Sequence, residues 1–179
     1  MEPLKFWVKL NTHPREVWRA WTETEKIINW FSPEANIEPR SGGAYELYFD
    51  PKDHDHMSTK GCTITEFKPM DRLGFSWKGP DQYRELMNEP DPLTHVEVEF
   101  KDEDGATQLT LEHGGWGDGE EWVEAREWHR RAWKGVLDQL ESFLSPQKDS
   151  ELTRVKIEKG KHQSRQGGLQ NRYSRYEQL

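Results

Sequence analysis

The fold is decided by residues 119–144, GEEWVEAREWHRRAWKGVLDQLESFL. Apolar residues recur along this stretch at steps of three and four, the spacing of one face of an α-helix. They are Trp122, Ala125, His129, Ala132/Trp133, Val136/Leu137, Leu140 and Phe143/Leu144. Asp118 is placed to cap the helix, and Glu121, three residues later, completes the pattern of a capping box. The sequence therefore predicts a long amphipathic helix whose apolar face needs a surface to cover it.

The chain before this helix alternates apolar and polar residues with a period of two. The alternating segments are residues 4–10, 45–49, 59–67, 73–77, 96–100 and 109–113. Asp102-Glu103-Asp104-Gly105 has the composition of a hairpin turn between the last two of them. Clean alternation is typical of an antiparallel sheet with one face in water and one face covered.

Two short helices are predicted between the first and second strands. Thr12-His13-Pro14 opens the first, with Thr12 or His13 near the cap and Pro14 in the first turn. The second begins at Thr24 and carries Ile27, Ile28, Trp30 and Phe31. The order of elements predicts an α+β fold, in which a curved antiparallel sheet wraps around the long C-terminal helix.

The composition points to a core built from aromatic residues. The 179 residues have a formal net charge of −8, a mean hydropathy of −1.08 and an apolar fraction of only 32%. So few aliphatic residues, combined with this charge, would ordinarily favour disorder. Nine Trp and five Tyr residues argue for folding, because each aromatic side chain can bury a large apolar area.

The charge pattern divides the chain at Ser145-Pro146. Residues 1–144 carry a net charge of −12 and all nine Trp, whereas residues 145–179 carry +4 and contain no Trp or Phe. This shift predicts a folded domain over 1–144 and a basic, polar, mobile extension over 145–179. Within the extension, the alternation of Val155 and Ile157 in residues 152–158 could pair as an edge strand when a partner is available.

Several classes of protein are excluded because the sequence lacks the features that they require. No apolar run approaches the roughly 18 residues that a membrane span needs. The start of the chain lacks the pattern of a signal peptide, and the one cysteine, Cys62, can form neither an intrachain disulfide nor a thiolate cluster. We therefore expect a cytoplasmic protein, and we expect Cys62 to be a small core residue rather than a nucleophile.

No motif predicts a cofactor, a metal or a nucleotide. The segment Gly114 to Gly119 has the glycines of a phosphate-binding turn but no lysine, and its acidic neighbours would repel phosphate, so we expect a tight turn from sheet to helix. Residues 53–56, Asp-His-Asp-His, offer metal-ligand types without a third anchored ligand nearby, which favours a solvated loop. We expect no nucleic-acid partner.

An ordered set of motifs is similar to the SRPBCC superfamily, which has the START/birch-pollen-allergen helix-grip fold. The set comprises Trp18-x-x-Trp21-Thr22, Trp30-Phe31, Gly42-Gly43-x-Tyr45, Gly61 to Phe67, Pro69-x-x-Arg72-Leu73-x-Phe75-x-Trp77 and Leu109 to Trp122. Within the superfamily, the chain most resembles the branch named after the activator of heat-shock protein 90 ATPase, over residues 3–144. The resemblance implies a cavity between the sheet and the long helix that holds an apolar or aromatic small molecule.

The expected ligand-binding residues are aromatic side chains and histidines on inward phases or at the mouth of that cavity. They are Tyr45, Phe49, Phe75, Trp77, His113, Trp116, Trp122, His129 and Trp133. The apolar rings would supply affinity, and His113, His129 or Tyr45 would orient the ligand by hydrogen bonding. No residue order indicates a covalent mechanism, and no catalytic residue is assigned.

Three functions remain open at this point. The first is a binding protein for an apolar or aromatic small molecule. The second is a protein-interaction module, such as a co-chaperone of an ATPase, and the third is an enzyme of the cyclase or hydrolase kind that uses the cavity histidines.

Overall fold

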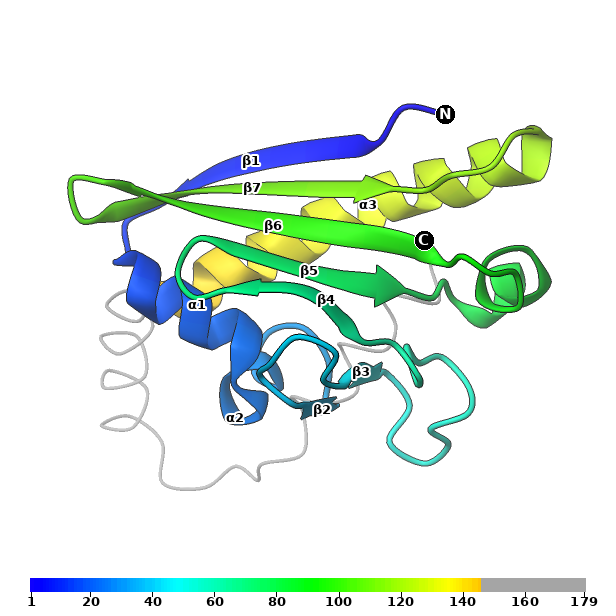
Figure 1. Cartoon of the computed structure of the whole chain (residues 1–179), viewed down its shortest axis with the longest axis horizontal. Coiled ribbons are helices and arrows are strands. Elements are labelled where there is room, and N and C mark those ends of the chain that lie inside the picture. Colours follow the sequence, from blue (N-terminus) through cyan, green and yellow to red (C-terminus); the bar gives the residue numbers. More distant parts are fainter. Residues whose placement is uncertain (146–179) are drawn as a thin grey trace, which may run out of the picture.

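A five-stranded antiparallel sheet is the largest layer of this computed structural model, which describes residues 1–145 (Figure 1). The strand order is β1 (Leu4–Leu10), β7 (Ala106–Gly114), β6 (Thr94–Glu103), β5 (Arg72–Trp77) and β4 (Ile64–Lys68). The β6–β7 hairpin turns at Asp104 and Gly105, both with positive φ, as the Asp-Gly signal predicts. Strand β1 therefore lies at one edge of the sheet and β4 at the other.

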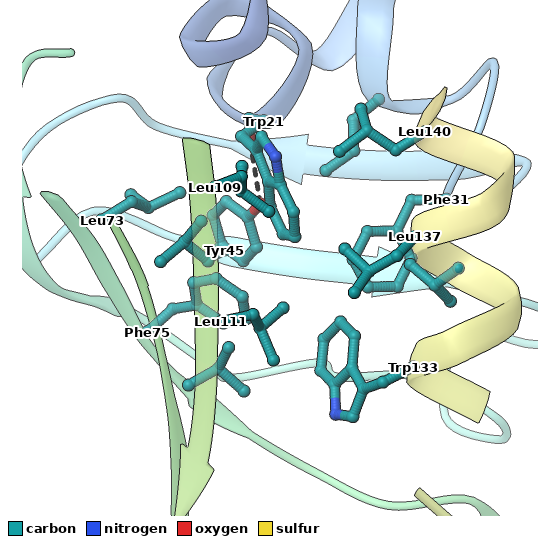
Figure 2. Packing of buried hydrophobic residues seen from close by; sticks show 14 of the residues in the cluster. Trp21, Phe31, Tyr45, Leu73, Phe75, Leu109, Leu111, Trp133, Leu137 and Leu140 are labelled. Carbon is teal, nitrogen blue, oxygen red and sulfur yellow. Dashed lines mark hydrogen bonds between the residues drawn. The ribbon is translucent and has the colours of Figure 1, made fainter. Parts of the chain in front are cut away.

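Helix α3 (Glu120–Leu144) lies along one face of this sheet, behind it in Figure 1. Its buried residues recur at steps of three and four, and they meet the buried alternate residues of β5, β6 and β7. In Figure 2, Trp133 and Leu137 point from α3 toward Leu111 and Phe75 of the sheet. This arrangement confirms the helix-grip fold.

The remaining elements of the domain are shorter. They are α1 (Pro14–Thr22), α2 (Thr24–Ile27), a two-stranded sheet of β2 (Glu34–Ile37) and β3 (Tyr45–Tyr48), the 3₁₀ turn η1 (Asp81–Tyr83) and the π-helical turn η2 (Arg84–Asn88). His13 is the N-cap of α1, and its Nδ1 accepts a hydrogen bond from the backbone N–H of Arg15. Pro14 occupies the first turn of α1, as expected.

The core is aromatic, as the composition predicts. Trp21 and Trp30 are buried and meet edge to face, with ring centroids 4.9 Å apart. Tyr45 stacks on Phe75 with ring centroids 4.2 Å apart, and its hydroxyl donates a hydrogen bond to the Trp21 carbonyl (2.8 Å; Figure 2). Cys62 is buried too, and burial raises the pKa of its thiol to about 11, which suits a core residue.

The predicted capping box is wrong. The N-cap of α3 is Gly119, and no side-chain hydrogen bond caps this helix. The Asp118 carboxylate lies 3.8 Å from the N-terminal ammonium of Met1 instead. The chain passes from β7 to α3 through residues 115–119, an irregular segment with bends in place of the expected tight turn.

Two predicted boundaries also shift. The strand expected over residues 59–67 begins only at Ile64, because residues 59–63 form turns and an isolated bridge from Thr63 to Ala44. Helix α2 ends at Ile27, so Trp30 and Phe31 lie in the turn that follows it. Strand β2 was not predicted.

Helix α3 ends at Leu144. The domain boundary expected at Ser145-Pro146 stays a prediction. The predicted extension lies outside the described residues. Within residues 1–145, no helix is both long enough and apolar enough to cross a membrane.

Candidate functional site

A small apolar cleft opens between α3 and the C-terminal end of β5. One wall is Trp77 of β5 with Phe31 and Phe49, and the floor is one face of α3. The remaining wall comes from two irregular segments, Met57-Ser58 and Lys78-Gly79-Pro80. The members of the α3 face are Trp128, His129, Ala132, Trp133 and Val136.

The cleft has about 30 Å³ of free space, enough for one or two water molecules. Pockets that hold small ligands usually measure roughly 300–1,000 Å³. Aromatic rings fill the remaining interior: the Trp77 ring centroid lies 5.1 Å from that of Trp133 and 6.0 Å from that of Phe31. In this conformation the cleft is closed to a drug-sized molecule.

A tryptophan–histidine pair joins β5 to α3 at the base of the cleft. The indole N–H of Trp77 donates a hydrogen bond to Nε2 of His129 (3.1 Å). The other ring nitrogen of His129, Nδ1, lies 2.7 Å from the Ala125 carbonyl, one helical turn earlier, and must therefore carry the proton. His129 is thus a neutral imidazole with both nitrogens used.

A second pair, deeper in the core, has the opposite tautomer. The indole N–H of Trp133 donates to Nδ1 of His113 (3.0 Å), so the proton of His113 is on Nε2, which faces the Thr94 hydroxyl at 3.0 Å. The Trp116 indole donates to the His113 carbonyl (2.7 Å). The two imidazole ring centroids lie 5.2 Å apart, so these pairs form one polar cluster inside the aromatic core.

Burial keeps both imidazoles neutral. Desolvation lowers the pKa of His129 to about 4 and that of His113 well below the usual histidine range. For His113, the nearby His129 and His95 lower the pKa further. A proton on either acceptor nitrogen would also replace an indole hydrogen bond by a clash of two N–H groups.

The two irregular segments at the mouth of the cleft are tied together by Asp81. One carboxylate oxygen, Oδ2, lies 2.8 Å from Nδ1 of His56, and the other, Oδ1, accepts the backbone N–H of Met57 (2.9 Å). The hydrogen bond to Asp81 and its charge raise the pKa of His56. The charged form of His56 therefore strengthens the connection across the mouth.

His54, the other histidine of the Asp-His-Asp-His loop, contacts a different part of the molecule. His54 Nε2 lies 2.7 Å from Glu34, and its ring stacks on Tyr48 with centroids 3.9 Å apart. The two loop histidines thus bind different carboxylates. Among residues 1–145, no cluster of three or more His, Cys, Asp or Glu side chains has the geometry to hold a metal ion.

The structure brings four of the nine expected site residues to the cleft: Phe49, Trp77, His129 and Trp133. Tyr45, Phe75, His113 and Trp116 are buried in the core beside it. Trp122 lies in the first turn of α3, half-buried, with its ring 6.3 Å from that of Trp116. Whether these residues bind a ligand stays a prediction.

Several residues of the cleft were missed by the sequence reasoning. Trp128 precedes His129 and belongs to the same buried face of α3, so a wider apolar stripe would have included it. Phe31 was predicted as apolar but not as part of a site. Met57, Gly79 and Pro80 belong to irregular segments, where no periodic pattern indicates which way a side chain points.

The cleft can offer apolar contact but few hydrogen bonds. All four ring nitrogens of His113 and His129 are already paired, as is the Tyr45 hydroxyl. At the mouth, the Ser58 hydroxyl donates to the His54 carbonyl and the Lys78 ammonium donates to the Lys60 carbonyl. Chemistry that needs a free imidazole has none at this site in the present conformation.

Comparisons with known proteins agree with this architecture. The protein MLL2253 from Mesorhizobium loti is 17% identical, with a TM-score of 0.62 over 79% of this chain and 96% of that one. CalU16 from Micromonospora echinospora is 24% identical, with a TM-score of 0.58 over 99% of this chain and 87% of that one. The Aha1 dimer from Colwellia psychrerythraea is 14% identical, with a TM-score of 0.60 over 80% of this chain and 96% of that one.

These likenesses establish the fold. No match was found among curated proteins. Residues 11–145 match the family described as activator of Hsp90 ATPase homolog 1-like protein, which is three quarters of the chain and includes β5, α3 and every wall of the cleft. The chain therefore belongs to this family, a branch of the SRPBCC superfamily.

Proposed function

We propose that this protein binds a flat apolar or aromatic small molecule in the cleft between β5 and α3. The observation that carries the proposal is the lining of the cleft, in which Phe31, Trp77, Trp128 and Trp133 surround a space with almost no polar surface. Burial of an apolar ligand against such rings would be the main source of affinity.

Binding would require the mouth of the cleft to open. The space of about 30 Å³ is too small for an aromatic ring system, and the rings on β5 and α3 are held by regular structure. The wall made by Met57-Ser58 and Gly79-Pro80 belongs to irregular segments instead. We propose that these two segments separate when the ligand enters, which breaks the contacts of Asp81 with His56 and Met57.

The proposal assigns no hydrogen bond to the buried histidines. Orientation of a ligand by His113, His129 or Tyr45, which the sequence suggested, would first have to break an existing hydrogen bond to each group. An unpaired buried donor or acceptor costs about 1–3 kcal/mol. Apolar contact therefore supports binding better than polar orientation does.

The test uses a variant that fills the cleft. Ala132 is buried on the α3 floor, and Ala132→Phe should block the space, whereas Val123→Phe adds the same ring at an exposed position of the same helix. We expect 1-anilinonaphthalene-8-sulfonate to bind the natural protein and Val123→Phe with affinities within about twofold, and Ala132→Phe at least tenfold more weakly.

Equal dye binding by all three proteins would contradict the cleft as the site. A second measurement identifies the natural ligand: native and denaturing mass spectrometry of protein purified gently from its own host. An extra mass that disappears on unfolding, and that Ala132→Phe fails to carry, would support the proposal independently of the dye.

Docking of a partner protein is a second candidate function, as the family description suggests. The observation that favours it is Trp7, which is 72% exposed on edge strand β1. A pull-down with the natural chain and Trp7→Ala tests this candidate. A partner captured equally by both would count against docking at β1.

A further inference from the structure

The mouth of the cleft has one firmly anchored wall, which contains Gly79 and Pro80. The side-chain amide of Asn88 accepts the backbone N–H of Gly79 (2.7 Å) and donates to the Gly79 carbonyl (2.9 Å). Gly79 also lies so close to the buried Met87 that a Cβ at residue 79 would come within 2.7 Å of the Met87 sulfur. Two residues of the π-helical turn η2 therefore fix this wall in place.

The opposite wall contains Met57, whose backbone has an unfavourable conformation. Its φ is +47°, in the left-handed region that residues other than glycine rarely adopt. On its own side of the mouth, its carbonyl accepts the backbone N–H of Phe49 (3.0 Å). Across the mouth, each hydrogen bond of Met57 within residues 1–145 uses Asp81: Oδ1 accepts the Met57 N–H (2.9 Å), and the Asp81 N–H donates to the Met57 sulfur (3.5 Å). Separation from Asp81 would therefore free this wall.

His56 adds a bond to the same carboxylate that depends on its own protonation. Its Nδ1 lies 2.8 Å from Oδ2 of Asp81, and its side chain is half-exposed, so it exchanges protons with solvent. Partial burial opposes the charge of Asp81, but the hydrogen bonds from Met57 and His56 lower the pKa of this carboxyl below its ordinary value. Asp81 therefore stays ionised wherever a histidine titrates, and the strength of the bond follows the charge of His56.

Other charged groups near His56 modify this bond without replacing it. Asp81 raises the pKa of His56 most, Asp53, at 3.9 Å from Nε2, raises it further, and Arg84 of η2 lowers it. Asp55, the preceding residue, is paired with a lysine ammonium 2.6 Å away. Asp53 and Asp55 belong to the same loop as His56 and would move with it. Opening the mouth therefore removes chiefly the influence of Asp81.

We propose that the contact between His56 and Asp81 is a pH-sensitive latch, which holds Met57 across the mouth at low pH and releases it as the pH rises. The inference rests on the proposed function, because it concerns entry of a ligand into the same cleft. It adds that the affinity for the ligand depends on pH.

The sign of this dependence follows from linkage. The pKa of His56 is higher in the closed form, where it faces Asp81, than in the open form, so a proton on His56 favours the closed form. A ligand that binds the open form therefore binds most weakly when His56 is charged. Its affinity should rise with pH above about 6.5, the ordinary pKa of histidine, until His56 is neutral in both forms.

The expected change is modest, because the side chains of both partners are partly exposed. An exposed ion pair shifts an equilibrium by roughly two- to fivefold. By the same linkage, a ligand that opens the mouth must lower the pKa of His56. The core histidines add nothing in this range, since the pKa of His129 is about 4 and that of His113 is also well below the usual value.

An uncharged dye tests the latch without adding a charge of its own. N-phenyl-1-naphthylamine has the ring system of 1-anilinonaphthalene-8-sulfonate but no sulfonate. In fluorescence titrations of the natural protein, we expect its dissociation constant to fall about two- to fivefold from pH 5.5 to pH 8.5. His56→Gln should abolish this change. The control His95→Gln removes an exposed histidine from the outer face of β6 and should retain it.

The backbone amide of Met57 reports the latch in the absence of any ligand. Its protection against hydrogen exchange, corrected for the intrinsic rate at each pH, should fall about two- to fivefold over the same interval in the natural protein. In His56→Gln the protection should stay constant. Asp81→Asn retains an oxygen for the Met57 N–H and should also lose the pH dependence.

The two measurements separate the latch from the proposed function. The latch would be overturned if the Met57 protection changed with pH to the same extent in the natural protein and in His56→Gln. A dye affinity that falls as the pH rises would overturn it as well. If the Met57 protection follows His56 as expected, but Ala132→Phe binds the dye as tightly as the natural protein, the latch is supported and the cleft is not the binding site.

Discussion

Two pairs of histidines lie in surroundings that favour opposite protonation states of the imidazole. His113 and His129 lie inside the aromatic core, where indole N–H groups hold them as neutral acceptors and burial lowers the pKa of each. His54 and His56 lie in an exposed loop against carboxylates, and the bond to Asp81 raises the pKa of His56. The core imidazoles are fixed as neutral hydrogen-bond acceptors, whereas the charged form is favoured at His56.

The difference follows from what each imidazole faces rather than from where it lies in the sequence. An indole donor can satisfy only a neutral ring nitrogen, whereas a carboxylate favours the protonated ring. The core cluster therefore stabilises the packing of α3 against the sheet. His56 is bonded to Asp81 at the mouth of the cleft, where the proposed function needs movement.

The largest expected effect in this comparison comes from Trp133. Trp133→Ala removes a buried indole and the donor to His113, and we expect it to lower the free energy of unfolding by about 3–5 kcal/mol. Trp7→Ala removes the same side chain from an exposed position and should cost less than about 1 kcal/mol. Urea unfolding at pH 7 measures both, and similar losses would contradict the role given to the core cluster.

The next effect is the response of stability to acid. The unfolded chain protonates its histidines near pH 6.5, but native His129 does so only near pH 4 and native His113 well below its usual range. Between pH 6.5 and 4 the unfolded state therefore binds more protons. The free energy of unfolding should fall as the pH falls, by up to about 1.4 kcal/mol per pH unit for each buried histidine.

His129→Gln isolates this contribution. Its amide oxygen can still accept the Trp77 indole, while one titrating group is lost. The carboxylates and His56 remain in both proteins, so the difference between their pH slopes from 6.5 to 4.5 reports the loss of His129, including its effect on the pKa of the neighbouring His113. Identical slopes in urea unfolding would mean that native His129 titrates near its ordinary value.

The fold was largely predictable from the sequence because the apolar residues of its main helix and strands recur with a regular period. The step of three and four residues in 119–144 and the alternation in residues 96–100 and 109–113 each fix which face is buried. The capping box failed because α3 begins at Glu120, so that its N-cap position falls on Gly119, which has no side chain to accept a hydrogen bond.

The candidate site was only half predictable. Trp77, His129 and Trp133 could be found because they lie on regular elements with a known inward phase. Met57 and Gly79-Pro80 could not, because they are placed by long-range bonds of Asp81 and Asn88. The pairing of each histidine with a particular indole likewise depends on sheet–helix packing, which no local pattern encodes.

The smallest expected effect concerns the exposed loop, where Asp81 contacts His56. Asp81→Asn keeps an oxygen that can accept the Met57 N–H but removes the charge beside His56. We expect the pKa of His56 to fall toward the ordinary histidine value, while Asp53, 3.9 Å away, continues to raise it in part. His129 serves as the internal reference, since its pKa of about 4 depends on burial and should stay unchanged. Imidazole C–H shifts followed by NMR between pH 4 and 9 measure both residues. If the His56 midpoint stayed where it is in the natural protein, Asp81 would not be the group that holds the charged imidazole, and the mouth of the cleft would be closed by the contacts between Asp81 and Met57.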